Sequence, residues 1–177
     1  MLMIMKRLTL IFAGLLALAA CSALPITIDL LPLLGDEVSG EQSISAAGDL
    51  DLRLPADEGV AISGYETIEY KPATVSLDYG LNLAQDGGLE GEAEVAFYLA
   101  APGDYLWDDD NLLGDPQRIE MDDTSQVVEG VLSLNQNQID ALVGGEIVVG
   151  ARITGNVTGS ARVSYEFTKL TLEITFF

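Results

Sequence analysis

The feature that most constrains the fold of this chain is a regular alternation of apolar and polar side chains. Every second side chain is apolar from Val75 to Leu83, and the same pattern returns from Leu170 to Phe176. Successive side chains of a β-strand point to opposite faces of the sheet, so a period of two is typical of strands with one buried and one solvated face. The chain is therefore predicted to be all-β, with antiparallel strands.

The same pattern, clear over 50–54, 147–153 and 157–167 and weaker elsewhere, divides much of the remaining chain into short strands. They cover residues 26–30, 50–54, 60–70, 92–100, 118–121, 127–134, 147–153 and 157–167. Turn-forming residues lie between them, including Asp86-Gly87-Gly88 and Gly155-Asn156. Many short strands with polar outer faces predict one antiparallel β-sandwich domain, or a flattened barrel, over residues 25–177.

One short helix is predicted near residues 135–143. Asn135 is a good capping residue, Ile139 and Leu142 are apolar, and Gly144-Gly145 is a stop signal. Two helical turns are not stable alone, so we expect the helix to plug one open end of the sandwich.

A short echo is present further along the chain, where Ala151-Arg152-Ile153 is followed by Ala161-Arg162-Val163. The glycines and polar residues of segment 154–160 predict a hairpin that joins two similar strands. The alternative is that two strands in similar surroundings have converged on similar residues.

The first residues have the composition of a targeting signal. Lys6 and Arg7 precede an apolar run from Leu8 to Ala20, and Cys21 follows directly. The run is too short to span a bilayer, which takes about 20 residues, and it has the form of a secretory signal. The segment Leu18–Cys21 resembles the lipobox of bacterial lipoproteins, in which the cysteine is acylated and the peptide before it is removed. The alternatives are a transmembrane anchor and a secretory signal with an incidental cysteine.

The lipobox resemblance implies an address for the protein. It makes Cys21 the lipidation site, with palmitate-type acyl chains, residues 1–20 a signal peptide, and 21–24 a short tether. Ser22 resembles the sorting residue of the outer-membrane class. Because two or three acyl chains hold a protein far better than one, the expected localisation is the outer membrane, on its periplasmic or its surface face.

The charge balance excludes one class of partner. The sequence has 28 Asp and Glu against eight Lys and Arg, and removal of residues 1–20 would change its net charge from −20 to −22. Binding of nucleic acid depends on Lys and Arg contacts to phosphates, so we expect no nucleic-acid partner. The acidic residues favour solubility, and divalent-cation binding or life in high salt are the alternatives.

Two residue counts limit the chemistry. The sequence has no histidine and a single cysteine. A Ser-His-Asp triad, histidine-ligated metals and thiol catalysis are therefore excluded once Cys21 is acylated. Oxygen-ligand chemistry remains, either with Ca²⁺ or Mg²⁺ or through a pair of carboxylates, and no cofactor is expected.

The least regular segment, residues 102–116, carries the candidate site residues. The spacing of Asp109, Asn111, Gly114 and Glu120 matches part of an EF-hand loop, although Leu113 stands where an oxygen ligand belongs. Asp109, Asn111 and Glu120 are thus metal-ligand candidates, against a simple solvated loop. Tyr105 and Trp107 are candidates for a sugar-stacking platform, against a Trp107 packed on the sandwich.

These observations predict a function without catalysis. We expect a non-enzymatic structural or interaction module of the cell envelope, held at the membrane by its lipid and contacting envelope proteins. The alternative is a binding module for a divalent cation, a glycan or an apolar ligand. A ligand binder needs a concave pocket, whereas an interaction module needs an exposed apolar patch or an open sheet edge.

Overall fold

The computed structural model describes residues 25–65, 68 and 71–176, and it confirms an all-β protein with one short helix. The strands are β1 (Ile26–Asp29), β2 (Ser39–Leu54), β3 (Val60–Ser63), β4 (Thr74–Gln85), β5 (Leu89–Ala100), β6 (Leu112–Glu120), β7 (Ser125–Ser133) and β8 (Glu146–Thr175). The helix is α2 (Gln136–Val143), and the 3₁₀ segments are η1 (Leu31–Val38) and η2 (Asp109–Asn111). The lipobox and Cys21 lie outside the described residues.

β8 is the central strand of a single antiparallel sheet. On one side it pairs in succession with β3, β2 and β1, and on the other side with β5 and β4. β6 then pairs with β5, and β7 pairs with β4. The register continues from Gln85 opposite Val163 to Leu89 opposite Gly159, so β4 and β5 follow β8 as one long segment.

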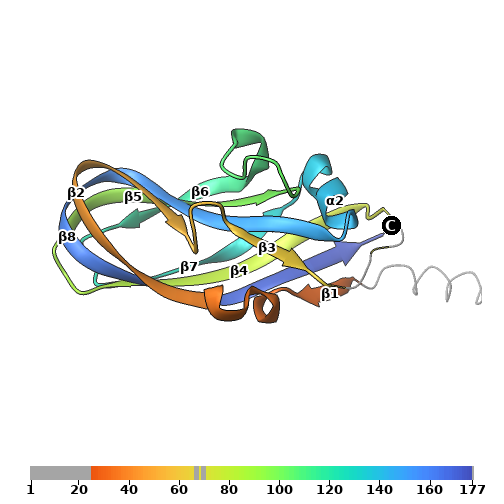
Figure 1. Cartoon of the computed structure of the whole chain (residues 1–177), viewed down its shortest axis with the longest axis horizontal. Helices are drawn as coiled ribbons and strands as arrows, with labels where there is room; N and C mark the ends of the chain where they lie inside the picture. Colours follow the sequence, from red (N-terminus) through yellow and green to blue (C-terminus); the bar gives the residue numbers. More distant parts are fainter. Residues whose placement is uncertain (1–24, 66–67, 69–70, 177) are drawn as a thin grey trace, which may run out of the picture.

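The sheet is folded in half across its strands. At the left end of Figure 1, β2, β8 and the β4–β5 connection all bend back toward the right. This fold line, the crease, passes through residues 46–48, 86–88, 121–124 and 157–160. One side of it, the β4 layer, holds β1, β4, β7, the first half of β2 and the second half of β8. The other side, the β5 layer, holds β3, β5, β6 and the remaining halves of β2 and β8.

Two glycines allow the backbone to bend this sharply. Gly88 and Gly159 both have positive φ angles, and a Cβ on Gly159 would overlap with the carbonyl oxygen of Gly88. Gln85 stabilises the crease, because its amide nitrogen donates to the carbonyls of Met121 and Asp123 while its oxygen accepts from the Leu89 amide. The close approach of the two segments therefore depends on glycine.

The predicted hairpin across residues 154–160 is wrong. β8 runs without reversal from Glu146 to Thr175, and the glycines of this segment bend the strand across the crease instead. Arg152 and Arg162 consequently lie on opposite sides of the crease. One tripeptide lies in each layer, so the echo does not mark two strands of a hairpin.

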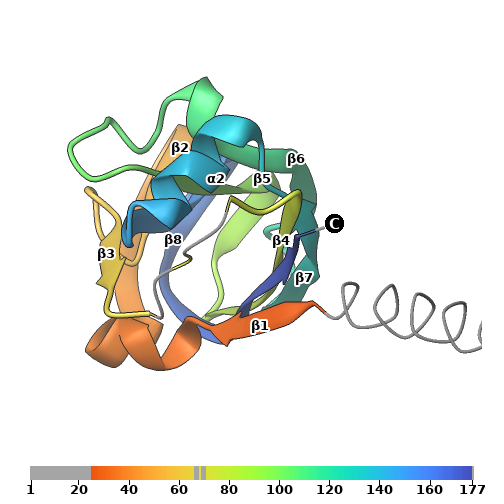
Figure 2. The same ribbon diagram turned by 90° about the vertical axis from the view of Figure 1, so that its right-hand side faces the viewer.

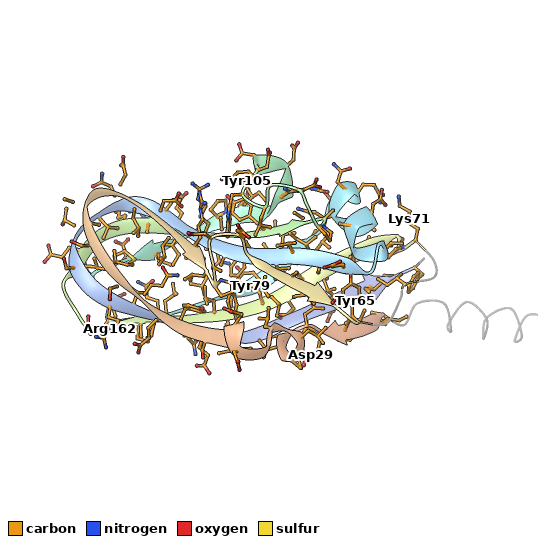
Figure 3. The ribbon with its side chains drawn as sticks, in the orientation of Figure 1. Asp29, Tyr65, Lys71, Tyr79, Tyr105 and Arg162 are labelled. Atoms are coloured by element: carbon orange, nitrogen blue, oxygen red, sulfur yellow. The ribbon has the colours of Figure 1, made fainter. Side chains whose placement is uncertain are left out.

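The core lies between the two layers. Tyr79 of β4 and Phe97 of β5 meet there with ring centroids 4.0 Å apart, and Figure 3 shows Tyr79 in the interior. A bulge in β8 changes which side chains point inward, so Phe167 and Leu170 are both buried although they are three residues apart. Gly80 faces this bulge, and a Cβ there would lie 2.5 Å from the Thr168 hydroxyl.

Helix α2 lies at the end opposite the crease, where the sandwich is open (Figures 1 and 2). Asn135 and Gln138 form a capping box at its first turn, as the sequence pattern indicates. Ile139 and Leu142 join the main core, and the Tyr65 hydroxyl donates to the carbonyl of Leu142 at 2.9 Å. Burial raises the pKa of Tyr65 to about 12. Within the described residues, no helix has the length and apolar character needed to cross a bilayer.

Candidate functional site

The outer surface of the β5 layer, the β5 face, is covered in part by its own loop, whereas a hollow of about 340 Å³ beside Glu92, Glu94 and Arg118 stays open. Ala96, Tyr98 and Ala100 point outward from β5, and residues 101–111 fold back over them. Trp107 from this loop is only 4% exposed and meets Tyr98 edge to face at 5.3 Å. The loop thereby builds a second small core outside the sandwich.

Polar contacts hold Trp107 in this position. Its indole nitrogen donates to the carbonyl of Asp57 at 2.6 Å, and the Arg53 guanidinium lies 5.5 Å from its ring centroid. Arg152 donates twice to Asp51, at 2.7 and 3.0 Å, and this hydrogen bonding lowers the pKa of the Asp51 carboxyl. The charged groups nearest the tryptophan are therefore engaged with each other.

A buried glutamine ties the loop to the helix. Gln138, the one polar residue in the buried set of the described residues, donates to the carbonyls of Asn111 and Leu112, both at 3.1 Å. Its side-chain oxygen accepts from the Asn135 amide at 2.8 Å. These contacts are structural, because they use both N–H donors of the amide group and one acceptor position of its oxygen.

The structure does not bring Tyr105 and Trp107 together as a platform. Tyr105 is 63% exposed at the tip of the loop, where Figure 3 shows it, whereas Trp107 is buried beneath the same loop. A sugar ring stacks on an accessible aromatic face, and Trp107 presents none. The sequence alternative, with Trp107 packed on the sandwich, describes the arrangement that is present.

The metal-ligand candidates are likewise separated. Asp109 and Asn111 lie in η2, whereas Glu120 ends β6 and lies 3.5 Å from Arg118. Because Leu112 pairs with Tyr98 and Glu120 pairs with Glu92, six residues earlier on β5, Asn111 and Glu120 stand roughly 20 Å apart. No group of three or more acidic side chains converges on a shared point anywhere in the described residues. The residues with EF-hand-like spacing therefore follow one another along β6 and do not form a metal-binding loop.

The outer surface of the β4 layer, the β4 face, has a different character. Val127 and Val131 point outward from β7 and are 64% and 63% exposed. Glu129 lies between them on the same face. No described loop covers these valines, so they form an apolar rim at the side of an otherwise polar sheet.

A groove of about 570 Å³ crosses this face beside the crease. It is lined by Ser39 and Glu41 from β2, Ser164 and Glu166 from β8, Asn82 and Ala84 from β4, and Ser125 and Val127 from β7. Glu166, Asn82 and Val127 are direct neighbours across three strands. The groove thus has a floor of small and hydroxyl-bearing side chains, carboxylates on one side and a valine on the other.

The charges of the β4 face are only partly paired. Arg162 lies 3.8 Å from Glu41, and Lys169 pairs with Asp78. The hydrogen bond to Asp78 raises the pKa of Lys169. Glu129 and Glu166 form no ion pair with any described residue. Glu166 in the groove and Glu129 beside it therefore lack a close cationic partner among the described residues, and Lys169 attracts Glu129 only over a longer distance.

Two cavities between the layers are too small for a ligand other than water. They have volumes of about 20 Å³, next to Gln85, and about 10 Å³, next to Phe97. The larger hollows, of about 340 and 570 Å³, lie on the outer surfaces of the two layers. The sequence signal for the β4 face lies in Val127-Val128 and Val131-Leu132, which place apolar side chains on both faces of β7 and so interrupt the simple alternation.

No protein-family model matches the sequence, and no curated protein matches it either. Solved structures similar to this chain include CBM28, a carbohydrate-binding module specific for non-crystalline cellulose, at 9% identity and a TM-score of 0.37, covering 69% of this chain and 72% of the other. PirA is 8% identical with a TM-score of 0.35, over 73% of this chain and 93% of PirA. The module TmCBM61, solved with β-1,4-galactotriose, is 7% identical with a TM-score of 0.32, over 82% of this chain and 88% of the module. These similarities assign neither a ligand nor an activity to the chain.

Proposed function

We propose that this protein is a non-enzymatic interaction module of the bacterial envelope, anchored through a lipid on Cys21. The observation that carries the proposal is the contrast between the two outer surfaces. Residues 101–111 cover the apolar part of the β5 face, whereas the β4 face leaves Val127 and Val131 exposed beside an open groove. An exposed apolar rim on a polar surface is typical of a protein-binding site.

The sequence supports the absence of catalysis in this proposal. It offers no histidine to act as a general base, and its single cysteine is the proposed lipidation site. The candidate residues of the acidic loop are held apart by β6, and Trp107 is buried. These placements favour an interaction module over the alternative of a binding module for a cation, a glycan or an apolar ligand.

The test of the interaction role is affinity purification from detergent-solubilised envelopes. We expect Val131→Asp to lose proteins that the wild type captures, because a charge would stand in the apolar rim. Thr158→Asp is the matched control, since Thr158 is an exposed position on β8 outside that rim. Identical captured proteins for all three chains would contradict the proposal.

The anchor is tested separately. Cys21→Ala should remove the acyl mass and release the mature protein from the membrane fraction, or leave it uncleaved. A wild type without acyl mass, whose Cys21→Ala variant still sediments with the outer membrane, would rule out the lipid anchor while leaving the interaction surface in place.

A further inference from the structure

We infer that the β4 face docks a basic segment of a partner protein, with Lys or Arg side chains at Glu129 and Glu166 and apolar side chains on Val127 and Val131. This inference rests on the proposed interaction function and specifies its partner. It commits to a polypeptide whose contact segment combines positive charge with apolar residues. Exposed apolar surface, unpaired charge and the spacing of the strands each support it.

The apolar surface comes from β7. Val127 and Val131 are two of the few large apolar side chains in the described residues that remain more than half exposed. They stand four residues apart on one strand face, which places them about 13 Å from each other. A partner segment that covers both removes apolar surface from water, and this contribution grows with the area covered.

The unpaired charge follows from how the cations are distributed. Each of the six Lys and Arg residues after Cys21 already forms an ion pair within the chain. Glu129 and Glu166 have no such partner among the described residues, and both flank the groove region. A cationic segment complements these carboxylates and is attracted over longer range by the net negative charge of the body.

The spacing follows from the sheet register. Glu166 and Val127 are separated by one strand, with Asn82 between them, so their backbones lie about 10 Å apart. Three residues of an extended segment span the same distance. The small side chains of Ser164 and Ala84 on the groove floor leave room for a backbone to lie across the strands.

Two other modes of association fit less well. Strand addition at the open edges is hindered, because Gln42 donates to the Arg53 carbonyl and Gln117 donates to the Glu129 carbonyl, each at 3.2 Å from one layer to the other. A second copy of this chain would bring the same uncompensated carboxylates to the interface, and like charges oppose such docking. A basic partner avoids both obstacles.

The experiment uses the full-length protein in detergent and a short labelled peptide that repeats Lys-Lys-Val-Val, so that each face of the extended segment carries both lysine and valine. Fluorescence anisotropy should show saturable binding that weakens about tenfold in Val127→Thr/Val131→Thr, as apolar contact is lost. Glu166→Gln should weaken it about threefold. Glu94→Gln on the β5 face removes the same charge as Glu166→Gln and should leave the affinity unchanged. Peptides that repeat Lys-Lys-Ser-Ser or Glu-Glu-Val-Val should bind at least tenfold more weakly.

Several results would overturn the inference. Equal losses of affinity in Glu94→Gln and Glu166→Gln would mean that the peptide responds to the overall negative charge of the protein and not to the β4 face. Unchanged binding in the valine double variant would remove the apolar contact, and a soluble β-1,4-glucan that occupies the groove while the peptide does not would make the ligand a glycan. If the peptide fails to bind but Val131 still governs capture of envelope proteins, the interaction function stands and the basic segment is wrong.

Discussion

The two outer faces of this folded sheet lie in equivalent positions on either side of the crease. They differ in whether a loop covers their apolar side chains. On the β5 face, Tyr98 and Trp107 are buried under residues 101–111 and contribute to stability. On the β4 face, Val127 and Val131 remain in solvent. The apolar side chains on the outside of one half of the sheet are thus covered by a loop, whereas those on the outside of the other half stay in solvent.

The sequence of the two strands records this difference. β4 alternates from Thr74 to Gln85, as a strand does when one of its faces meets solvent. β5 becomes continuously apolar from Val95 to Ala100, and all six of these residues are buried. A continuous apolar run is typical of a strand covered on both faces, so this change of pattern marks where the loop covers the sheet.

The largest test of the comparison is Trp107→Ala. Removing this side chain should lower the free energy of unfolding by about 3–5 kcal/mol, because it empties the outer core and leaves the Asp57 carbonyl without its donor. Urea denaturation measures the change. Tyr105→Ala in the same loop should stay within about 0.5 kcal/mol of wild type, since that side chain is exposed. Equal effects of the two substitutions would mean that the loop does not stabilise the β5 face.

The second test removes the side chain that connects the same loop to the helix. Gln138→Ala leaves the carbonyls of Asn111 and Leu112 unpaired, so we expect a loss of about 1–3 kcal/mol. Gln136→Ala removes an exposed amide from the same helix and should cost less than about 0.5 kcal/mol. Thermal denaturation of both variants separates the buried contact from helix propensity, and equal costs would contradict the role given to Gln138.

Most strands and the helix could be predicted from local pattern, because alternation and capping act within a few residues. The first half of β2 could not, since Ser, Ala and Gly fill it and Ile44 is its only large apolar residue. The predicted strand over 60–70 stops at Ser63, directly before Gly64 with its positive φ. β6 starts at Leu112, inside the segment that the sequence indicated as irregular.

The crease could not be predicted, because it depends on pairing between distant residues. Gly87-Gly88 and Gly155-Asn156 look like turns in the sequence, and only the contact of Gly88 with Gly159 shows that they bend a whole sheet. The metal-ligand candidates of the acidic segment do not converge, for a related reason. The EF-hand spacing gives ligand order along the chain, whereas a metal site needs ligands that converge in space, and β6 keeps them apart.

The third test uses pH to distinguish the ion pairs of the two faces. Arg152 lowers the pKa of Asp51 on the β5 face, so this carboxylate stabilises the fold at neutral pH and the contribution is lost in acid, below about pH 4. Asp51→Asn should flatten the acid limb of the stability profile by less than about 1 kcal/mol, because the pair is partly exposed.

The matching pair on the β4 face should respond in alkali. The pKa of Lys169 is raised by Asp78, so its contribution is present below the ordinary lysine pKa and is lost as the pH rises above about 10. Lys169→Met should flatten the alkaline limb. An alkaline limb that is unchanged in Lys169→Met, or an acid limb that is unchanged in Asp51→Asn, would show that the assignment of that pair is wrong.

The smallest change in stability is expected for substitutions of the exposed valines of β7. These substitutions test the difference between the two faces most directly. Val127→Thr/Val131→Thr should alter the free energy of unfolding by no more than about 0.5 kcal/mol, because both side chains are already in solvent and threonine keeps their shape and strand preference. Val128→Thr in the same strand places a hydroxyl in the core, where Val128 is 3% exposed, and should cost about 1–3 kcal/mol. Urea denaturation compares the two variants. A double variant as unstable as Val128→Thr would show that the exposed valines support the fold, and they would then no longer mark the β4 face as the surface kept free for a partner.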